Sequence, residues 1–397
     1  MFALLLLAVS IQSDFEGGSI GKVEYVSEGL VRCAVAGEVD QDKRNRQASW
    51  YYFRVDGAAG QPLTVELVDL PGEYNYRSNR GAITKDTIPV YSEDDVHWQH
   101  FDASAVEYDE SEPVLRLRFT PKSNRFWIAH VPPYTNMHLR SLLRSFAGHP
   151  HARVESVGRT VRGREIPLLT ITDPSAPDDP KRVVWLMFRQ HSWESGSSWV
   201  GEGAIRYLLS EDPEAWQIRK STIFKILPMC DPDGVARGGV RFNVHGYDLN
   251  RNWDVRDEKL MPEIAAERKA VLDWARSGRK VDLLLTVHNT ETSEYIDGPP
   301  DTDNGFAELT ARLYEKLIEM TSFAPTRPPR KMEESTARGR PGRMSVVQGL
   351  YRDRKMPAYL MEQRIAYNPK LGRLPTIEDR KRFGAELVRA IDATLSR

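Results

Sequence analysis

The clearest hydrophobic pattern in the chain is an unbroken apolar run at residues 182–188, which ends just before a polar turn. A run of this length without alternation predicts a strand that is buried on both faces. Apolar residues at helical spacing follow from about residue 197 to 209, which predicts a helix directly after the turn. Similar apolar runs at 222–227 and 281–287 predict two more buried strands.

This alternation of strands and helices continues from about residue 145 to the end of the chain. A helix is predicted from Pro262, because proline is favoured at the first helical position, to about Gly278. An amphipathic helix that carries Phe383 and Leu387 closes the chain. The pattern therefore predicts an α/β domain at residues 145–397, with a mixed, mostly parallel sheet flanked by helices.

The first part of the chain has a different pattern. Residues 16–142 contain short runs rich in aromatic and β-branched residues, separated by glycine and proline, and residues 115–119 alternate between apolar and polar. These features predict an all-β sandwich domain. The polar stretch at 91–112 is expected to be a long surface loop. A length of 397 residues agrees with two domains.

The N-terminus begins with a short apolar run that ends in a small-x-small pattern at Ser10. Residues 1–13 are a candidate signal peptide, which would make the protein secreted or periplasmic. No Lys or Arg precedes the run, so a buried first strand in a cytoplasmic protein stays as the alternative. No apolar run is long enough to span a membrane.

The amino-acid composition excludes few classes of function. The net charge of −1 gives no overall electrostatic reason to expect nucleic acid as a partner. Neither of the two cysteines lies in a CxxC pair, so a thiolate metal site is not indicated.

Polar residues of metal-binding type follow two of the predicted strands. His191 comes after the run at 182–188, Glu194 lies three residues later, and His288 follows the third strand. The carboxyl ends of parallel strands meet at one edge of a sheet, where ligands of open α/β sheets bind. Two histidines and a glutamate with an open fourth position form a known catalytic zinc site. The alternative is a surface His–Glu pair and a histidine that only bonds a loop.

Other polar and charged residues are predicted to lie near the same edge of the sheet. Arg241, Asn250 and Arg251 follow the second strand, and arginine is suited to binding a carboxylate. A solvated loop is the alternative for these three. Glu362 ends an apolar run, where an unpaired carboxylate is costly to bury, so it is either a catalytic base or an ion-pair partner of Arg364.

Taken together, these segments resemble the zinc carboxypeptidases of the M14 type, most closely their cytosolic carboxypeptidase branch. His-Ser-Trp-Glu at 191–194 is similar to that family's His-Pro-Gly-Glu, and Pro-Met-Cys-Asp-Pro-Asp-Gly at 228–234 to its Pro-Met-x-Asn-Pro-Asp-Gly. Residues 247–253 are similar to Val-Asp-Leu-Asn-Arg-x-Trp. His288 and Glu362 match the third ligand and the base. Segments such as 50–55 look like that branch's N-terminal β-sandwich, so the resemblance covers nearly the whole chain.

The resemblance implies a role for each matching residue. It implies one Zn²⁺ per chain, held by His191, Glu194 and His288. Glu362 would move the proton, and Arg241 would stabilise the oxyanion. The terminal carboxylate of the substrate would be clamped by Asn250 and Arg251, and Asp248 would hold the ring of His191 in the right tautomer.

The chain departs from the family pattern at several positions. Ser192 and Trp193 replace Pro-Gly, and Asp231 replaces Asn, which puts substrate preference in doubt more than catalysis. The branch removes acidic residues, and Arg343 could supply the basic group for a glutamate side chain. If Val347 takes that position instead, the pocket is apolar.

The sequence thus predicts a zinc metallocarboxypeptidase that hydrolyses the C-terminal amino acid from peptides or proteins, with a preference for acidic residues. One alternative is an amidohydrolase that acts on cell-wall or γ-glutamyl peptides with the same zinc site. Another is an inactive peptidase-fold module that only binds.

Overall fold

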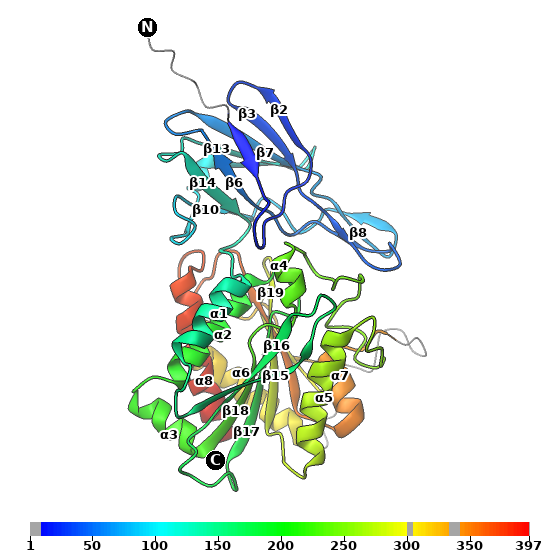
Figure 1. The fold of residues 1–397 in the computed structure, drawn as a ribbon, viewed down its shortest axis with the longest axis vertical. Coiled ribbons are helices and arrows are strands. Elements are labelled where there is room, and N and C mark those ends of the chain that lie inside the picture. Colours follow the sequence, from blue (N-terminus) through cyan, green and yellow to red (C-terminus); the bar gives the residue numbers. More distant parts are fainter. Residues whose placement is uncertain (1–8, 300–304, 333–341, 397) are drawn as a thin grey trace.

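The computed structural model describes residues 9–299, 305–332 and 342–396. A β-rich N-terminal domain stands on one end of a larger α/β domain (Figure 1). The predicted fold class, an all-β sandwich followed by a mixed sheet flanked by helices, is confirmed. The predicted division between residues 142 and 145 falls inside helix α1 (Asn136–Ser145), whose Leu142 packs into the core of the α/β domain.

The N-terminal domain contains two five-stranded sheets with an apolar core between them. Buried residues alternate with more exposed ones along Leu30–Ala34 and most of Val114–Phe119, as the period of a pleated strand requires. The first sheet has the order β1 (Ser10–Gln12), β6 (Tyr52–Asp56), β14 (Arg125–Ala129), β10 (Val90–Ser92), β11 (Gln99–His100). The second has the order β12 (Val106–Asp109), β13 (Val114–Phe119), β7 (Leu63–Val68), β3 (Leu30–Ala34), β2 (Val23–Ser27).

The prediction of one long surface loop at residues 91–112 is wrong. This region contains β11, a short 3₁₀ helix η1 (Ala103–Ala105) and β12. These elements are only two to four residues long, and β12 alternates polar and apolar residues over too short a span to be distinguished from a loop.

A small third sheet lies where the N-terminal domain approaches the α/β domain. Its order is β4 (Glu38–Val39), β5 (Arg46–Gln47), β8 (Gly72–Tyr74), β9 (Arg77–Asn79). Figure 1 shows β8 on the arm that extends above the α/β domain.

The α/β domain is built on one eight-stranded sheet. Its order is β15 (Ala152–Arg159), β16 (Glu165–Ile171), β18 (Thr222–Leu227), β17 (Arg182–Phe188), β19 (Leu283–Thr290), β22 (Ala358–Arg364), β20 (Tyr295–Gly298), β21 (Arg330–Lys331). The four central strands β18, β17, β19 and β22 are parallel. Helices cover both faces, which is why these strands are apolar without alternation.

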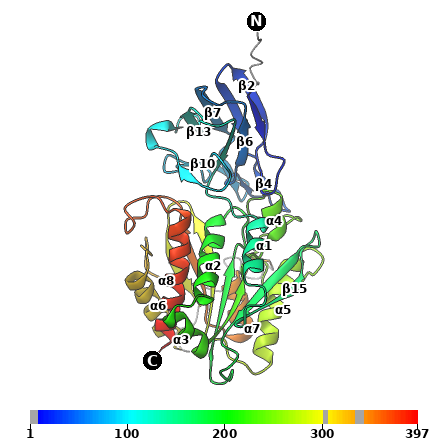
Figure 2. The same ribbon diagram turned by 60° about the vertical axis from the view of Figure 1, so that its left-hand side comes forward.

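The two faces of the sheet carry different helices. One face packs against α2 (Ser195–Leu208), α3 (Pro213–Ser221), α6 (Phe306–Met320) and α8 (Ile377–Leu395). The other packs against α5 (Pro262–Arg276) and α7 (Val346–Arg354). Figure 2 shows α2 and α8 side by side on the first face. Strand β17 contacts both layers, since Leu186 faces the first group of helices and Trp185 the second.

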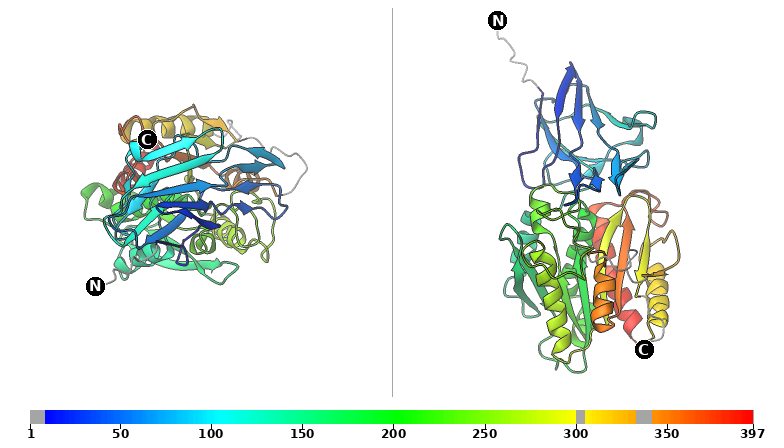
Figure 3. Two further views of the ribbon diagram at one scale, coloured as in Figure 1. Left: turned by 90° about the horizontal axis from the view of Figure 1, so that it is seen from above. Right: turned by 90° about the vertical axis from the view of Figure 1, so that its right-hand side faces the viewer.

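The N-terminal domain covers the carboxyl end of the parallel strands (Figure 3). The short helix α4 (Pro232–Ala236), which follows β18, lies at this junction (Figure 1). Any site at the carboxyl edge of the sheet is therefore bordered by both domains.

Strand β1 lies within the segment predicted as a signal peptide, and it pairs with β6 in the first sheet. Residues 1–8 of that segment are outside the described residues. Within the ranges that the structure describes, no helix combines the length and apolar character needed to cross a bilayer.

Candidate active site

Three predicted metal ligands meet at the carboxyl edge of the sheet. His191 and Glu194 lie in the turn between β17 and α2, and His288 is on the neighbouring strand β19. Strand β17 ends at Phe188, where polar residues replace the apolar run, and the chain then enters α2. Glu362 on β22 is directly opposite His288 in the strand register. Residues from three separate parts of the sequence, the turn after β17 and the strands β19 and β22, thus lie close together.

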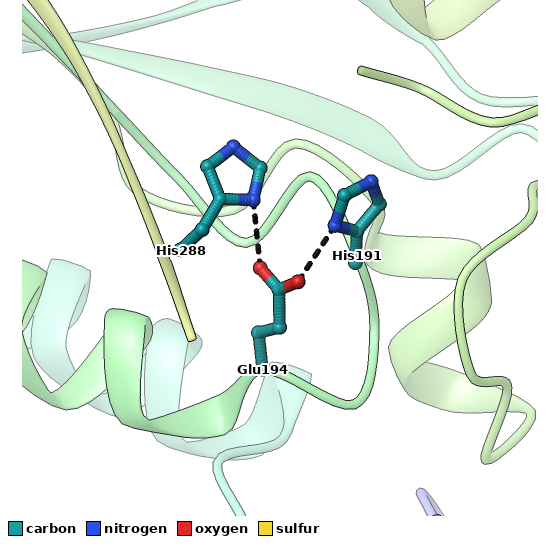
Figure 4. Close-up of side chains that lie close together, drawn as sticks. All are labelled: His191, Glu194 and His288. Atoms are coloured by element: carbon teal, nitrogen blue, oxygen red, sulfur yellow. Dashed lines mark hydrogen bonds and ion pairs between the residues drawn. The ribbon is translucent and has the colours of Figure 1, made fainter. Parts of the chain in front are cut away.

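The donor atoms of the three ligands converge (Figure 4). The Glu194 carboxylate lies between the two rings, with Oε1 2.7 Å from His191 Nδ1 and Oε2 2.8 Å from His288 Nδ1. One donor atom from each residue lies within 4.8 Å of the others, and all three residues are buried. Two imidazole nitrogens and a carboxylate are a ligand set that zinc accepts in catalytic sites, so these residues fit the ion.

The charge state of Glu194 suits a metal ligand. Burial by itself would raise the pKa of this carboxyl, but the adjacent His191 and His288 lower the pKa to about 2. Glu194 is therefore ionised at neutral pH even though it is buried.

Asp248 fixes the orientation of His191. Its Oδ1 lies 3.0 Å from His191 Nε2. Because an ionised carboxylate can only accept, Nε2 carries the proton and the lone pair of Nδ1 is left for a metal. Burial raises the pKa of Asp248, but Arg241 and His191 outweigh it and hold the pKa well below its ordinary value. The contact with His191 is compatible with the role that the family resemblance implies for Asp248, which stays a prediction.

His288 has a comparable set of partners that the sequence analysis missed. Its Nε2 lies 3.2 Å from Gln190 Oε1 and 3.0 Å from Thr286 Oγ1, and both oxygens can accept a hydrogen bond. Thr286 Oγ1 in turn donates to Gln190 Oε1 at 2.8 Å. The signals were present in the sequence, because Gln190 directly precedes the first ligand and Thr286 is two residues before the third.

Arg241 lies beside the metal ligands. Its Nε donates to Asp248 Oδ2 at 2.7 Å, so Asp248 joins this guanidinium to His191. Arg241 borders two cavities at the domain junction. One, of about 280 Å³, is also lined by Glu194 and Glu362, and the other has about 540 Å³. A cation in this position can stabilise negative charge that develops next to the ligands.

Glu362 has the environment of a proton-transfer group. It lines the same 280 Å³ cavity as Glu194, and its Oε2 is buried without a hydrogen-bond partner in the described part of the chain. Burial, followed by the nearby charge of Glu194, raises the pKa of Glu362 well above its ordinary value. The other interpretation of Glu362, an ion pair with Arg364, is not observed among the described residues, because Arg364 pairs with Glu294.

The predicted substrate-binding residues separate into two groups. Arg251 and Arg343 both line the 540 Å³ cavity. Asn250 does not: its buried side chain accepts from Val346 N at 3.1 Å, and its Nδ2 lies 3.2 Å from His288 Nε2. The rival specificity residue, Val347, is fully buried in α7 among the apolar side chains beneath the sheet.

Arg189 is a further residue that sequence reasoning missed. It is fully buried two positions before His191, with a left-handed backbone φ of 61°. Its Nε and Nη2 donate to the carbonyl oxygen of Ser192 at 2.9 and 2.7 Å, and its Nη1 donates to Tyr134 O at 3.2 Å. The guanidinium thus supports the turn that carries both His191 and Glu194.

Comparison with known proteins agrees with this geometry. Residues 11–131 match the model of the cytosolic carboxypeptidase N-terminal domain, and residues 139–322 match the zinc carboxypeptidase model. An uncharacterised protein of Zymomonas mobilis is 29% identical over 79% of this chain and 78% of its own length. Cytosolic carboxypeptidase 2 of Danio rerio is 34% identical over 70% of this chain, but the match spans only 42% of that protein.

Solved structures show the same fold. A metallo-carboxypeptidase from Burkholderia cenocepacia superposes with a TM-score of 0.83 at 24% identity, covering 98% of both chains. The likeness therefore extends over both domains and includes their order along the chain. With the two family models matching in sequence on either side of α1, this chain belongs to the zinc carboxypeptidase (M14) family, in the group with the cytosolic carboxypeptidase N-terminal domain.

Proposed function

We propose that this protein is a zinc-dependent carboxypeptidase that removes the last amino acid from peptides or proteins. The observation that carries the proposal is the grouping of His191, Glu194 and His288 at the same cavity as Glu362 and Arg241. The three ligands would hold one zinc ion per chain. When bound, zinc would acidify a water molecule and polarise the scissile carbonyl group.

The residues around the ligands would carry the proton and the charge. Glu362 Oε2 is buried and has no hydrogen-bond partner among the described residues, so this carboxylate could accept the proton of the attacking water and deliver it to the leaving amine. Arg241 can donate to the oxygen that becomes negative, and Asp248 holds its guanidinium on that side of the cleft. Glu362 and Arg241 line the same cavity, so one substrate carbonyl group could meet both the proton-transfer group and the cation.

Recognition of a free C-terminus would depend on Arg251. This side chain lines the large cavity next to Arg241, and arginine binds carboxylates in a two-pronged geometry. An internal peptide bond offers no such carboxylate, which would restrict the enzyme to chain ends. Asn250 stays a predicted partner, although its side chain here contacts His288 and α7 rather than the cavity.

The proposed preference is for an acidic last residue. Arg343 lines the same cavity as Arg251, whereas Val347 is buried in the core, so the wall that a substrate side chain meets carries a cation. A glutamate side chain would complement that charge. The names of the cytosolic carboxypeptidase relatives favour the cytoplasm over secretion as the compartment.

A peptide panel tests the proposal. Peptides that differ only in the last residue are incubated with the zinc-loaded protein, with and without a chelator, and the released amino acid is measured. We expect chelator-sensitive release of one residue, fastest for glutamate, and no release from C-terminally amidated controls. Cleavage of γ-glutamyl or muropeptide substrates alone would support the amidohydrolase, and binding without any release would support the inactive module.

A further inference from the structure

The loop that carries Arg241 is held by the N-terminal domain. This loop, residues 237–248, connects α4 to the segment that contains Asp248 and lies against the small sheet that includes β4. Gly17 N donates to Ala236 O at 3.1 Å just before the loop, and Gln41 N donates to Gly246 O at 3.1 Å near its end. Between these two contacts, a single carboxylate from β4 binds the loop.

That carboxylate belongs to Glu38. Its Oε2 accepts from three consecutive backbone N–H groups, those of Val240 at 3.0 Å, Arg241 at 2.5 Å and Phe242 at 2.9 Å. Its Oε1 forms an ion pair with Arg237, at the start of the same loop. Successive N–H groups that point at one anion form a nest, and hydrogen bonds to a charged acceptor are about twice as strong as neutral ones.

The position of Glu38 links it to the metal ligands through short contacts. Glu38 fixes the backbone of Arg241, Arg241 Nε donates to Asp248, and Asp248 accepts from His191. The same segment also touches the ligand turn directly, since Trp193 N donates to Val240 O at 3.0 Å. A shift of the loop by even a fraction of an ångström would therefore move the guanidinium relative to the three ligands.

We propose that Glu38 of the N-terminal domain is a positioning residue for catalysis, which holds Arg241 where the oxyanion forms. The inference rests on the proposed function, because it assigns Glu38 to the same reaction. It makes the N-terminal domain part of the active site, in addition to a wall of the cleft. An effect of this kind acts through geometry, so it should lower the turnover rate more than the affinity for substrate.

The chain offers a matched control for the interface contribution of Glu38. Glu16 is also an N-terminal-domain carboxylate that accepts a backbone N–H from the other domain, that of Asn136 at 3.0 Å, and it lies 3.7 Å from Arg140. Its contacts are with α1 and not with the Arg241 loop. Glu16→Ala removes a similar interface contact while leaving Arg241 untouched.

The experiment compares Glu38→Ala, Glu38→Gln and Glu16→Ala in the full-length zinc-loaded protein. For each we would measure kcat and KM on the best peptide, zinc content, thermal stability, and inhibition by a phosphonate peptide analogue whose tetrahedral group mimics the oxyanion. We expect Glu38→Ala to lower kcat about 10- to 100-fold with full zinc content and a KM within about 3-fold. The phosphonate Ki should rise in proportion to the loss in kcat/KM.

Glu38→Gln keeps an oxygen that can accept from the nest, so it should recover part of the rate. Glu16→Ala should keep kcat within about 2-fold even where its melting temperature falls as far as that of Glu38→Ala. Equal kcat values per zinc-loaded molecule for Glu38→Ala and wild type would overturn the inference. So would an unchanged phosphonate Ki. If wild type itself releases no amino acid, the proposed function fails before Glu38 is tested, so the two failures are distinguishable.

Discussion

Substitution of Asp248 tests the arrangement of the site, because Asp248 contacts both His191, a proposed metal ligand, and Arg241, which we propose to stabilise the oxyanion. Its Oδ1 accepts from His191 Nε2 at 3.0 Å and Asn250 N at 2.8 Å, and its Oδ2 accepts from Arg241 Nε at 2.7 Å. In Asp248→Asn the amide oxygen can satisfy the first two donors. The NH₂ group then faces Arg241 Nε, which also donates, so the guanidinium loses its partner.

Two effects of Asp248→Asn follow. A neutral amide supports the His191 ring less than a carboxylate does, and loss of such a partner typically weakens metal binding about 10- to 100-fold, or about 1.4 to 2.8 kcal/mol. The displaced Arg241 should also lower kcat at saturating zinc by at least about 10-fold. Zinc affinity is measured by competition with a chromogenic chelator, and turnover by release of the C-terminal amino acid.

The control for this prediction is Asp254→Asn. Asp254 lies a few residues further on and accepts backbone N–H groups of Gly342 at 2.9 Å and Met344 at 3.2 Å, without touching a ligand. We expect it to leave zinc affinity within about 2-fold, because it makes no contact with the metal site. If Asp248→Asn binds zinc as tightly as Asp254→Asn does, the assignment of Asp248 as the support of His191 is refuted.

Three other substitutions give separate tests. Glu362→Gln should lower kcat by about 10²- to 10⁴-fold while zinc content stays full, because the amide cannot accept the proton; a variant with wild-type kcat would remove Glu362 from the mechanism. Arg251→Ala should raise KM by about 10-fold or more for peptides with a free C-terminus, and an unchanged KM would exclude the carboxylate clamp. Burial, followed by the charge of Glu263, raises the pKa of Asp231 from 3.8 to about 8, so the unfolded chain loses this proton at lower pH than the folded chain does. Stability should therefore fall as pH rises through that window, and Asp231→Asn should flatten the slope in urea unfolding at pH 5 and pH 8; equal slopes in both proteins would contradict the pKa assignment.

The elements that carry the ligands were predictable because their sequence pattern is simple. β17 and β19 are buried on both faces, so each is an apolar run, and His191 and His288 are the first histidines after those runs. The parallel register then brings them together without further information from the sequence. Glu362 was singled out by a similar pattern, a lone acid at the end of an apolar run, and the structure pairs it with His288 in the register of β19 and β22.

Contacts between the domains could not be predicted in this way. Glu38 is in a two-residue strand, more than 200 positions from the loop that it binds, and nothing in its neighbourhood of the sequence indicates a partner. The role of Asn250 was assigned from a motif, but a motif gives the position of a side chain in the sequence and not its rotamer. In the structure, the side chain of Asn250 lies between His288 and Val346 and does not line the cavity.

The turn at residues 191–194 differs from the family pattern, and side-chain contacts support it here in place of proline and glycine. In the family pattern, proline restricts the backbone φ in the turn, and glycine permits backbone conformations that other residues avoid. Ser192 and Trp193 have neither property. The structure instead holds the turn from two sides. Arg189 donates two hydrogen bonds to Ser192 O. The Trp193 ring stacks on His130 of the N-terminal domain, with ring centroids 5.7 Å apart and ring planes at 15° to each other.

His130 is itself stacked on Tyr51 at 5.5 Å, so three rings connect the ligand turn to the β-sandwich. Trp193 is buried and lines the smaller cavity together with Glu194 and Glu362. The effect of this bulky residue on substrate preference stays a prediction, and its ring contact with His130 also places it at the domain junction. The turn at residues 191–194 and the Arg241 loop thus both contact the N-terminal domain, the first through His130 and the second through Glu38. Because these contacts lie next to the proposed metal ligands, we expect the geometry of the site to depend on the β-sandwich.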